Sequence, residues 1–368
     1  MNTQLRRTAV AVAAAAMAVS LAACGSAKEA SDNGSGGDEK KKDGPLTIGL
    51  LMPDDQTARY ENFDRPLIEE RVKELCADCE ISYVNAKQDA SVQQQQMNSM
   101  VTKKVDVIIL DAVDSKSIAN SVKKADDAGI PVVAYDRLAE GPISAYTSFD
   151  NEEVGKVQGQ ALLDALGDKA DDGQIVMMNG SPTDPNAALF KKGAKSVLDG
   201  KVKVGKSYDT TNWEPGEANK NMNGAIASVG KENIVGVYSA NDGLAGGIIT
   251  ALKSAGVSPL PPVTGQDAEL AGVQRIVAGE QYMTVYKPFK PEAYAAAEMA
   301  VALGRGEKPD TDATVDSPTH KGIPATLIQP ISVTADKVKD TIVKDGLYKV
   351  EEICTSKYAA ACKKVGLQ

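Results

Sequence analysis

The sequence predicts an α/β fold built from two lobes, each with a doubly wound parallel sheet. From residue 46 onward, short apolar runs rich in β-branched residues alternate with polar segments of helical period. This alternation is typical of parallel strands separated by covering helices. The same plan begins again after Asp150, and residues 45–368 are too many for one ordinary core. Two lobes in tandem predict a cleft at the carboxyl ends of both sheets, where such sheets bind ligands.

The apolar runs place the strands, and the polar segments between them place the helices. In the first lobe we expect strands over 46–52, 81–85, 105–110, 131–135 and 145–149. Helices are expected over 66–75, 91–103 and 115–128, the last of which is ended by Gly129. In the second lobe a helix over 154–166 precedes strands over 174–179, 202–208, 234–239, 263–265 and 283–285.

The N-terminal segment has the pattern of an export signal. Arg6 and Arg7 precede an apolar run over 9–23 that is too short to span a bilayer as a mature helix. It ends in Leu-Ala-Ala-Cys-Gly, which resembles the bacterial lipobox, so we expect cleavage after residue 23 and a lipid on Cys24. Ordinary cleavage beside a chance cysteine is the alternative. Residues 24–44 have almost no apolar side chains and predict a flexible tether, which leaves the protein anchored to the outer face of the cell membrane.

Composition narrows the class of protein. The net charge is −9, with acidic and basic residues interspersed, so no basic stripe is available for nucleic acid. His320 is the only histidine and lies in a polar segment flanked by Pro and Gly, where a surface position is expected. One histidine leaves little room for metal or histidine-dependent catalytic schemes, so we expect no metal, no cofactor and no catalytic residues.

Four cysteines remain beside Cys24, namely Cys76, Cys79, Cys354 and Cys362. In an exported protein an even number favours two structural disulfides. The sequence does not choose between the two local pairs and cross-links between the two segments. The Cys-x-x-Cys spacing also fits a redox motif or half a zinc site, but it ends a helical segment and no second half accompanies it.

Polar and aromatic residues gather after successive predicted strands. Carboxylates, amides, Arg and Lys together satisfy the hydroxyl groups of a neutral polyol, and an aromatic plate covers the apolar face of a sugar ring. Taken singly, each has a structural alternative, since Asp often caps a helix and a lone Trp usually packs in the core. The candidates are Arg59, Tyr60, Asp136, Arg137, Asp184, Asn186, Trp213, Asn241, Asp242, Gln266, Asp267 and Lys287.

Six separated motifs carry a family resemblance from about residue 46 to 348. They are Ala-Tyr-Asp-Arg at 134–137, Thr-Ser-Phe-Asp-Asn-Glu at 147–152, Asn-Gly-Ser-Pro at 179–182, Ser-Ala-Asn-Asp-Gly at 239–243, Gly-Gln-Asp-Ala at 265–268 and Met-Thr-Val-Tyr-Lys-Pro at 283–288. In this order they resemble the bacterial D-xylose-binding proteins, which belong to the periplasmic binding protein family with the ribose, arabinose and galactose binders.

This resemblance implies a type I periplasmic binding protein with three chain crossings near 149–151, 286–288 and 329–331. The lobes are then residues 45–149 with 288–329 and residues 150–287 with 330–350, and 351–368 form a tail beyond the family pattern. The sugar contacts implied are Arg59, Asp136, Arg137, Asp184, Asn186, Trp213, Asn241, Asp267 and Lys287. Tyr60 stands where the family pattern has Trp, so one aromatic wall is altered.

The function implied is high-affinity capture of a monosaccharide, D-xylose first, by a monomer that delivers it to an ABC permease. Glucose, galactose and arabinose remain alternatives, as does a sugar-sensing ectodomain that reports to a signalling partner. A sugar-processing enzyme is a third hypothesis, with Asp136 and Asp267 as a glycosidase pair. Arg137 and Lys287 nearby are expected to hold these carboxylates ionised, which favours hydrogen bonding over proton donation and a protein that is not an enzyme.

Overall fold

The computed structural model describes residues 44–367. The expected signal segment 1–23, Cys24 and all but the last residue of the expected tether 24–44 lie outside the described residues. Within the described part of the chain, no helix combines the length and the apolar character needed to cross a membrane.

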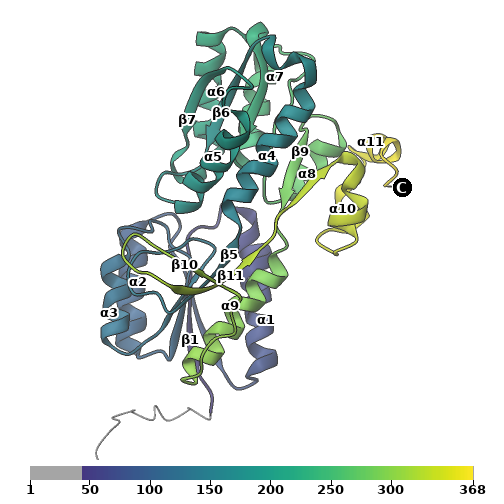
Figure 1. The fold of residues 1–368 in the computed structure, drawn as a ribbon. Coiled ribbons are helices and arrows are strands. Elements are labelled where there is room, and N and C mark those ends of the chain that lie inside the picture. The colour runs from purple at the N-terminus through teal and green to yellow at the C-terminus, as the bar shows by residue number, and fades with distance from the viewer. Residues whose placement is uncertain (1–43, 368) are drawn as a thin grey trace, which may run out of the picture. The chain divides into compact units, whose positions relative to one another are not determined.

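A seven-stranded sheet, with its covering helices, forms what we call the first lobe (Figure 1). The strand order is β10-β11-β5-β4-β3-β1-β2, and all neighbours are parallel except the edge strand β10. The strands are β1 (Thr47–Met52), β2 (Glu80–Asn85), β3 (Val107–Leu110), β4 (Val132–Tyr135), β5 (Ala145–Phe149), β10 (Ala313–Val315) and β11 (Ile323–Ile328). β1, β3, β4 and β5 are almost wholly buried, as expected for parallel strands covered on both faces.

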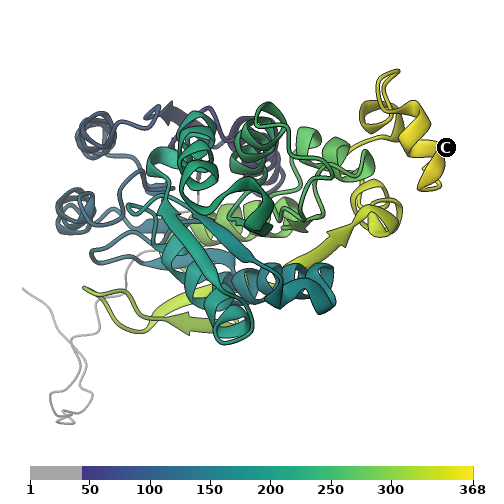
Figure 2. The same ribbon diagram turned by 90° about the horizontal axis from the view of Figure 1, so that it is seen from above.

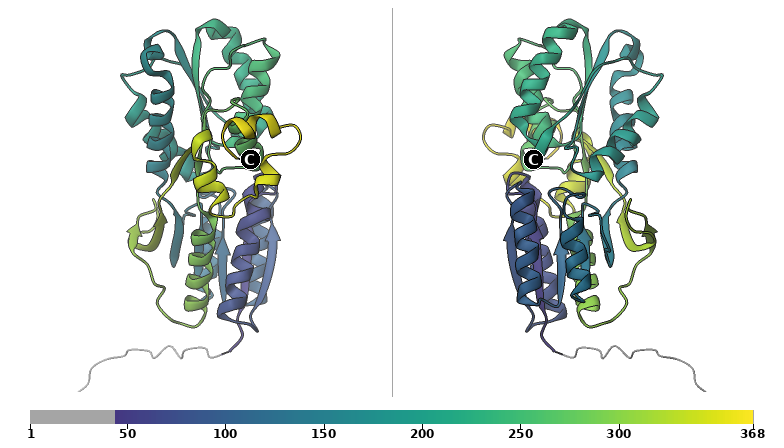
Figure 3. Two further views of the ribbon diagram at one scale, coloured as in Figure 1. Left: turned by 90° about the vertical axis from the view of Figure 1, so that its right-hand side faces the viewer. Right: turned by 90° about the vertical axis from the view of Figure 1, so that its left-hand side faces the viewer.

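Two pairs of helices cover this sheet. α1 (Arg65–Leu75) and α9 (Phe289–Gly304) lie side by side on one face, as Figure 3 shows. α2 (Ala90–Lys103) and α3 (Ala119–Asp127) cover the other face. The two resulting cores are rich in aliphatic side chains, so burial of apolar surface on both faces stabilises the sheet.

The second lobe has a three-stranded parallel sheet in the order β7-β6-β8 and a two-stranded antiparallel ribbon. The strands are β6 (Gln174–Asn179), β7 (Val204–Asp209), β8 (Ile234–Ser239), β9 (Met283–Tyr286) and β12 (Ile331–Thr334). The helices are α4 (Asn151–Leu166), α5 (Pro185–Leu198), α6 (Pro215–Val229), α7 (Asp242–Ser254) and α8 (Leu270–Val277). Short helical turns cover Tyr60–Asp64, Gly167–Asp171, Thr211–Trp213, Lys231–Asn233, Ala335–Lys337 and Lys339–Val343.

The chain passes between the lobes three times, from β5 to α4, from β9 to α9 and from β11 to β12. The crossings are neighbours, because Phe149 pairs with Ile328 at the end of one sheet and Ile331 pairs with Tyr286 in the ribbon. The predicted fold class, two α/β lobes joined by a three-crossing hinge, is confirmed.

Some predicted boundaries are wrong, for local reasons. The helix expected from residue 115 begins only at Ala119, because the Asp114 side chain accepts from the backbone of residues 116 and 117 and holds a turn there. The helix expected from 154 begins at Asn151, because Asp150 caps it by accepting from Glu153 N. The strand expected over 263–265 is only an isolated bridge between Val263 and Val237.

The C-terminal segment is packed onto the second lobe (Figures 1 and 2, yellow). It contains α10 (Val350–Ile353) and α11 (Ala359–Lys364), joined by the disulfide Cys354–Cys362. Buried side chains of this segment share one core cluster with α8 and the ribbon. The other disulfide is Cys76–Cys79, so both bridges are local. The Tyr348 ring, just before α10, meets Phe63 of the first lobe edge-on, with ring centroids 5.7 Å apart.

Candidate functional site

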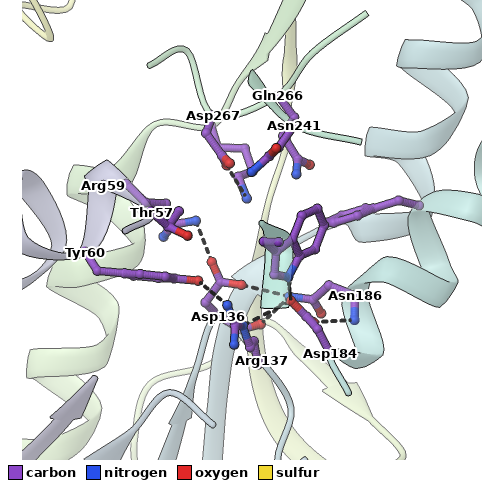
Figure 4. Close-up of a pocket in the computed structure, with 13 residues that line it drawn as sticks. Thr57, Arg59, Tyr60, Asp136, Arg137, Asp184, Asn186, Asn241, Gln266 and Asp267 are labelled. Atoms are coloured by element: carbon purple, nitrogen blue, oxygen red, sulfur yellow. Dashed lines mark hydrogen bonds and ion pairs between the residues drawn. The ribbon is translucent and has the colours of Figure 1, made fainter. Parts of the chain in front are cut away.

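One cavity lies where the two lobes face each other (Figure 4). All ten residues predicted to bind ligand line it, although they come from seven separate loops. The lining residues are Thr57, Arg59, Tyr60, Asp136, Arg137, Asp184, Asn186, Phe190, Trp213, Asn241, Gln266, Asp267 and Lys287.

Three lining residues are outside the set predicted to bind ligand. Two of them were never candidates, and the third was a candidate that was not retained. Thr57 lies two residues before Arg59 in the same loop, and Phe190 lies one helical turn after Asn186 on α5. Residues four apart lie on the same face of a helix, so this spacing could have predicted that Phe190 lines the cavity with Asn186. Gln266 was among the candidates but outside the final set. Asp242 does not line the cavity and is fully buried behind it.

Most of the lining side chains follow the carboxyl end of a strand, where open α/β sheets bind ligands. In the first lobe the loops after β1 and β4 contribute Arg59 and Asp136. In the second lobe the loops after β6, β7 and β8 contribute residues 184–186, 213 and 241. The crossing after β9 contributes Lys287. Parallel strand order therefore brings residues more than two hundred positions apart into one site.

Three of the lining residues hold left-handed backbone conformations that side chains with a β-carbon rarely adopt. The φ angles are +53° at Asp136, +57° at Trp213 and +88° at Asp267. Such conformations cost free energy and cluster where geometry serves binding or catalysis. Their presence around one cavity indicates a built site.

Arg59 is buried among three carboxylates on three different elements. Its Nε donates to Asp64 Oδ2 at 2.7 Å, its Nη1 to Asp136 Oδ2 at 2.5 Å and its Nη2 to Glu292 Oε2 at 2.5 Å. Burial alone would lower its pKa, but these negative charges raise the pKa well above its ordinary value. Arg59 is therefore a fixed cation that holds Asp136 toward the cavity.

Arg137 links the two lobes. Its Nε lies 3.0 Å from Asp184 Oδ2 in the second lobe, and its Nη2 donates to the Tyr60 hydroxyl at 3.2 Å in the first. Behind it lies the fully buried Asp111, whose pKa is raised well above its ordinary value by burial, against the opposing charge of Arg137. This guanidinium has a fixed orientation at the floor of the cavity (Figure 4).

Trp213 and Phe190 form an aromatic wall on the second lobe, with ring centroids 6.3 Å apart in an edge-on arrangement. The indole Nε1 donates to Asp184 Oδ2 at 3.2 Å, which fixes the plane of the ring. Asp184 also caps α5 by accepting from Asn186 N at 2.9 Å. Asp184 therefore both caps α5 and lines the cavity.

The remaining polar groups come from the second lobe and the β9 crossing. Lys287 Nζ lies 2.8 Å from Asp267 Oδ1. Asn241 caps α7 through its Oδ1, which accepts from Leu244 N, so its Nδ2 is the end of the amide left to donate to a ligand. Gln266 Oε1 is buried and accepts no hydrogen bond from any residue between 44 and 367.

The charges that line the cavity are balanced. Three cationic side chains face three carboxylates, and burial of a net charge is thereby avoided at the surface a ligand would touch. Burial would raise the pKa of Asp136, but the charges of Arg59, Lys287 and Arg137 outweigh it and lower that pKa. Burial raises the pKa of Asp184, with Arg137 opposing it. A balanced set of donors and acceptors suits an uncharged polar ligand.

Comparisons with known proteins identify the family. Residues 48–308 match the periplasmic binding protein domain. The D-xylose-binding periplasmic protein of Escherichia coli is 38% identical over 314 residues, covering 84% of this chain and 92% of that protein. A multiple sugar-binding periplasmic receptor of Rhizobium radiobacter is 33% identical over 328 residues, covering 83% and 92%. The chain belongs to the periplasmic binding protein family, so the resemblance seen in the sequence is confirmed.

A solved structure agrees with this assignment. An ABC transporter solute-binding protein from Clostridium phytofermentans with bound β-D-glucose superposes with a TM-score of 0.78 at 26% identity. The match covers 83% of this chain and 99% of that one. The likeness therefore includes both lobes of that protein.

Proposed function

We propose that the protein captures a monosaccharide outside the cytoplasm, closes its lobes around it and delivers it to an ABC sugar permease. The observation that carries this proposal is the cavity itself, lined by buried carboxylates, amides, guanidinium groups and one indole from both lobes. Hydroxyl groups donate one and accept two hydrogen bonds, so this mixture can satisfy a ring of them. The Trp213 and Phe190 wall supplies the apolar contact that the C–H face of a sugar needs.

D-xylose is the favoured ligand, on the strength of the Escherichia coli relative. The relative that binds multiple sugars, and the glucose-bound structure, keep other monosaccharides as alternatives. Tyr60 bears on this choice, because its ring lines the cavity and its hydroxyl accepts from Arg137. A phenol at this wall adds a polar group beside the sugar.

Closure is supported by contacts that join the lobes directly. Asn186 Nδ2 donates to Asp136 Oδ1 at 2.8 Å, and Gln88 Nε2 donates to the carbonyl of Asn212 at 3.0 Å. In this proposal the moving bodies are residues 45–149 with 288–329 and residues 150–287 with 330–350. A sugar that touches both shifts the population toward the closed form by its higher affinity for that form.

We further propose that the protein is not an enzyme. A glycosidase needs one carboxyl group free to donate a proton to the leaving group. The pKa of Asp136 is lowered by the cations around it, and Asp267 Oδ1 lies 2.8 Å from Lys287 Nζ, so each carboxylate of the hypothetical glycosidase pair faces a cation. Both carboxylates therefore act as hydrogen-bond acceptors. Release of product from labelled glycosides would contradict this part of the proposal.

The cellular setting completes the proposal. We propose export and a lipid on Cys24 that tethers the protein to the outer face of the membrane, which the N-terminal pattern supports, and we propose that the folded body is a monomer. Cys24→Ser tests the anchor: the variant should appear in the culture medium, whereas the unchanged protein should fractionate with membranes. A variant that stays in the membrane fraction would contradict it.

A thermal-shift screen across about a dozen monosaccharides tests the central function. Ligand that binds only the folded state raises the melting temperature according to its affinity. We expect D-xylose to give the largest shift, with a free amino acid as the control that should give none. If no sugar stabilised the protein, the proposed function would be wrong.

A further inference from the structure

Asn151 is the first residue of α4, directly after the crossing from β5, and it does not line the cavity. Its side chain is buried, with 4% exposed. The amide nitrogen donates twice, to Ser148 Oγ at 3.1 Å in the first lobe and to Asn186 Oδ1 at 2.9 Å in the second. One amide group at the hinge therefore touches both lobes.

The second donation determines which way the Asn186 amide points. With Asn186 Oδ1 facing Asn151, its Nδ2 must face the opposite way, toward the first lobe. There Nδ2 donates to the carbonyl oxygen of Asp136 at 3.0 Å and to Oδ1 of the same residue at 2.8 Å. A reversed amide would set an oxygen against the Asp136 carboxylate, and that contact would be repulsive.

Asp136 needs such support. Its φ of +53° is unfavourable for a residue with a β-carbon, and its carboxylate is a cavity wall. Arg59 holds one oxygen of that carboxylate and Asn186 the other. The Asn186 contact is the one that crosses between the lobes.

We propose that Asn151 is a positioning residue for ligand binding, which sets the orientation of the Asn186 amide and through it the Asp136 carboxylate. The hydrogen bonds run from the hinge at Ser148 through Asn151 and Asn186 to the cavity. This inference rests on the proposed function, since its readout is monosaccharide affinity.

Two substitutions separate this role from packing. Asn151→Ala removes the donor to Asn186 Oδ1 and leaves the Asn186 amide held only by its bonds to Asp136, so affinity for D-xylose should fall about two- to fivefold. Asn151→Asp keeps the shape but, when ionised, offers only acceptors to Asn186 Oδ1, and affinity should fall about tenfold or more. If Asn151 acted only by packing, Asn151→Ala should lose more affinity than Asn151→Asp, because alanine removes more atoms.

The introduced carboxyl group also gives a pH signature. On its own segment the neighbouring charges are Asp150 and Glu152, and Glu152 is paired with Lys192 at 2.7 Å. On the other side, Asn186 connects it to two further carboxylates, Asp136 and Asp184. In its protonated form it can donate to Asn186 Oδ1 as the amide does. The affinity of Asn151→Asp should therefore fall as pH rises, more steeply than that of the unchanged protein.

The experiment is calorimetry with D-xylose on these variants and on Asn186→Ala, alone and combined with Asn151→Ala. If Asn151 acts through Asn186, Asn151→Ala should weaken D-xylose binding little further in a protein that already carries Asn186→Ala. Asn223→Asp, an exposed amide on α6, is the matched control and should bind as the unchanged protein does. Circular dichroism melting confirms that each variant is folded.

The outcomes are distinct. Non-additive losses, with aspartate worse than alanine, support the inference. Unchanged affinity in both Asn151 variants, or strictly additive losses in the double variant, overturns it while the proposed function stands. An unchanged protein that binds neither D-xylose nor another monosaccharide overturns the proposed function itself.

Discussion

The backbone of Gly180 lies directly against the indole ring of Trp213. A β-carbon at residue 180 would stand 2.0 Å from Cη2 and 2.3 Å from Cζ2 of that ring, far inside van der Waals contact. The glycine is therefore required by the aromatic wall of the cavity, and it offers a way to move the indole without removing it.

Gly180→Ala should push Trp213 out of its plane and weaken D-xylose binding by about tenfold or more. The Trp213 Nε1 to Asp184 bond would be lost with the displacement, so two cavity groups move together. Gly216→Ala is the control, because a β-carbon there meets nothing within 4 Å. Calorimetric affinities that are equal for the two variants would contradict this account of the wall.

Arg59 should be essential for stability as well as binding. Arg59→Met leaves the buried carboxylates of Asp64, Asp136 and Glu292 without their cation, and breaking such a pair costs about 3–5 kcal/mol. Urea unfolding without ligand measures this loss. Arg71→Met, which removes surface ion pairs with Glu74 and Glu298 and a cation–π contact with the Tyr294 ring, should change stability little. A small effect at both positions would mean that the buried carboxylates are not held by Arg59.

Stability should fall as pH rises through neutrality, because two acids behind Asp267 prefer to be protonated. Burial raises the pKa of Asp242 to about 7, and burial together with the Asp242 charge raises the pKa of Glu269 to about 8. Both lie above the ordinary value of about 4, so the folded state binds more protons than the unfolded state between about pH 4 and pH 8. Their contribution is complete below that window and is lost as pH rises through it.

The melting temperature should accordingly be higher near pH 5.5 than near pH 8.5. Glu269→Gln removes one of the two acids and should flatten the decline. Differential scanning calorimetry over this range checks both statements. A decline as steep in the variant as in the unchanged protein would show that Glu269 does not carry it.

The Cys354–Cys362 bridge should hold α11 to α10 and so keep the C-terminal segment ordered where it packs beside α8. Replacing both cysteines with serine removes a loop constraint of about 2–3 kcal/mol and should speed hydrogen exchange in α10 and α11. The same replacement at Cys76 and Cys79 is the control and should leave exchange in that segment unchanged. Protection that survives loss of the C-terminal bridge would show that packing of Tyr348 and Ile353 is sufficient.

Much of the fold and site could be predicted because both follow from local patterns. Strand runs such as those ending at Met52 and Tyr135 are recognisable from composition, and the rule that ligands bind at carboxyl ends then gathers Arg59 and Asp136. Trp213 could be selected because it is the only tryptophan. None of these steps needs knowledge of tertiary contacts.

What could not be predicted depends on contacts between distant segments. Glu292 lies in an alanine-rich stretch that reads as an ordinary helix, and only the packing of α9 beside α1 brings it to Arg59. Asn151 reads as a residue near a helix start, and its hold on Asn186 appears only once α4 and α5 are packed. The cysteine pairing likewise required the positions of both segments.

The most direct test of the central claim is a calorimetric titration of D-xylose into the purified protein and into Asp267→Ala. We expect saturable binding at one site in the unchanged protein, and affinity at least about tenfold weaker in the variant, because Lys287 loses its partner and the sugar loses an acceptor. The variant should melt as a folded protein. Equal affinity in the two proteins, or no binding of D-xylose or any other monosaccharide by the unchanged one, would contradict the account.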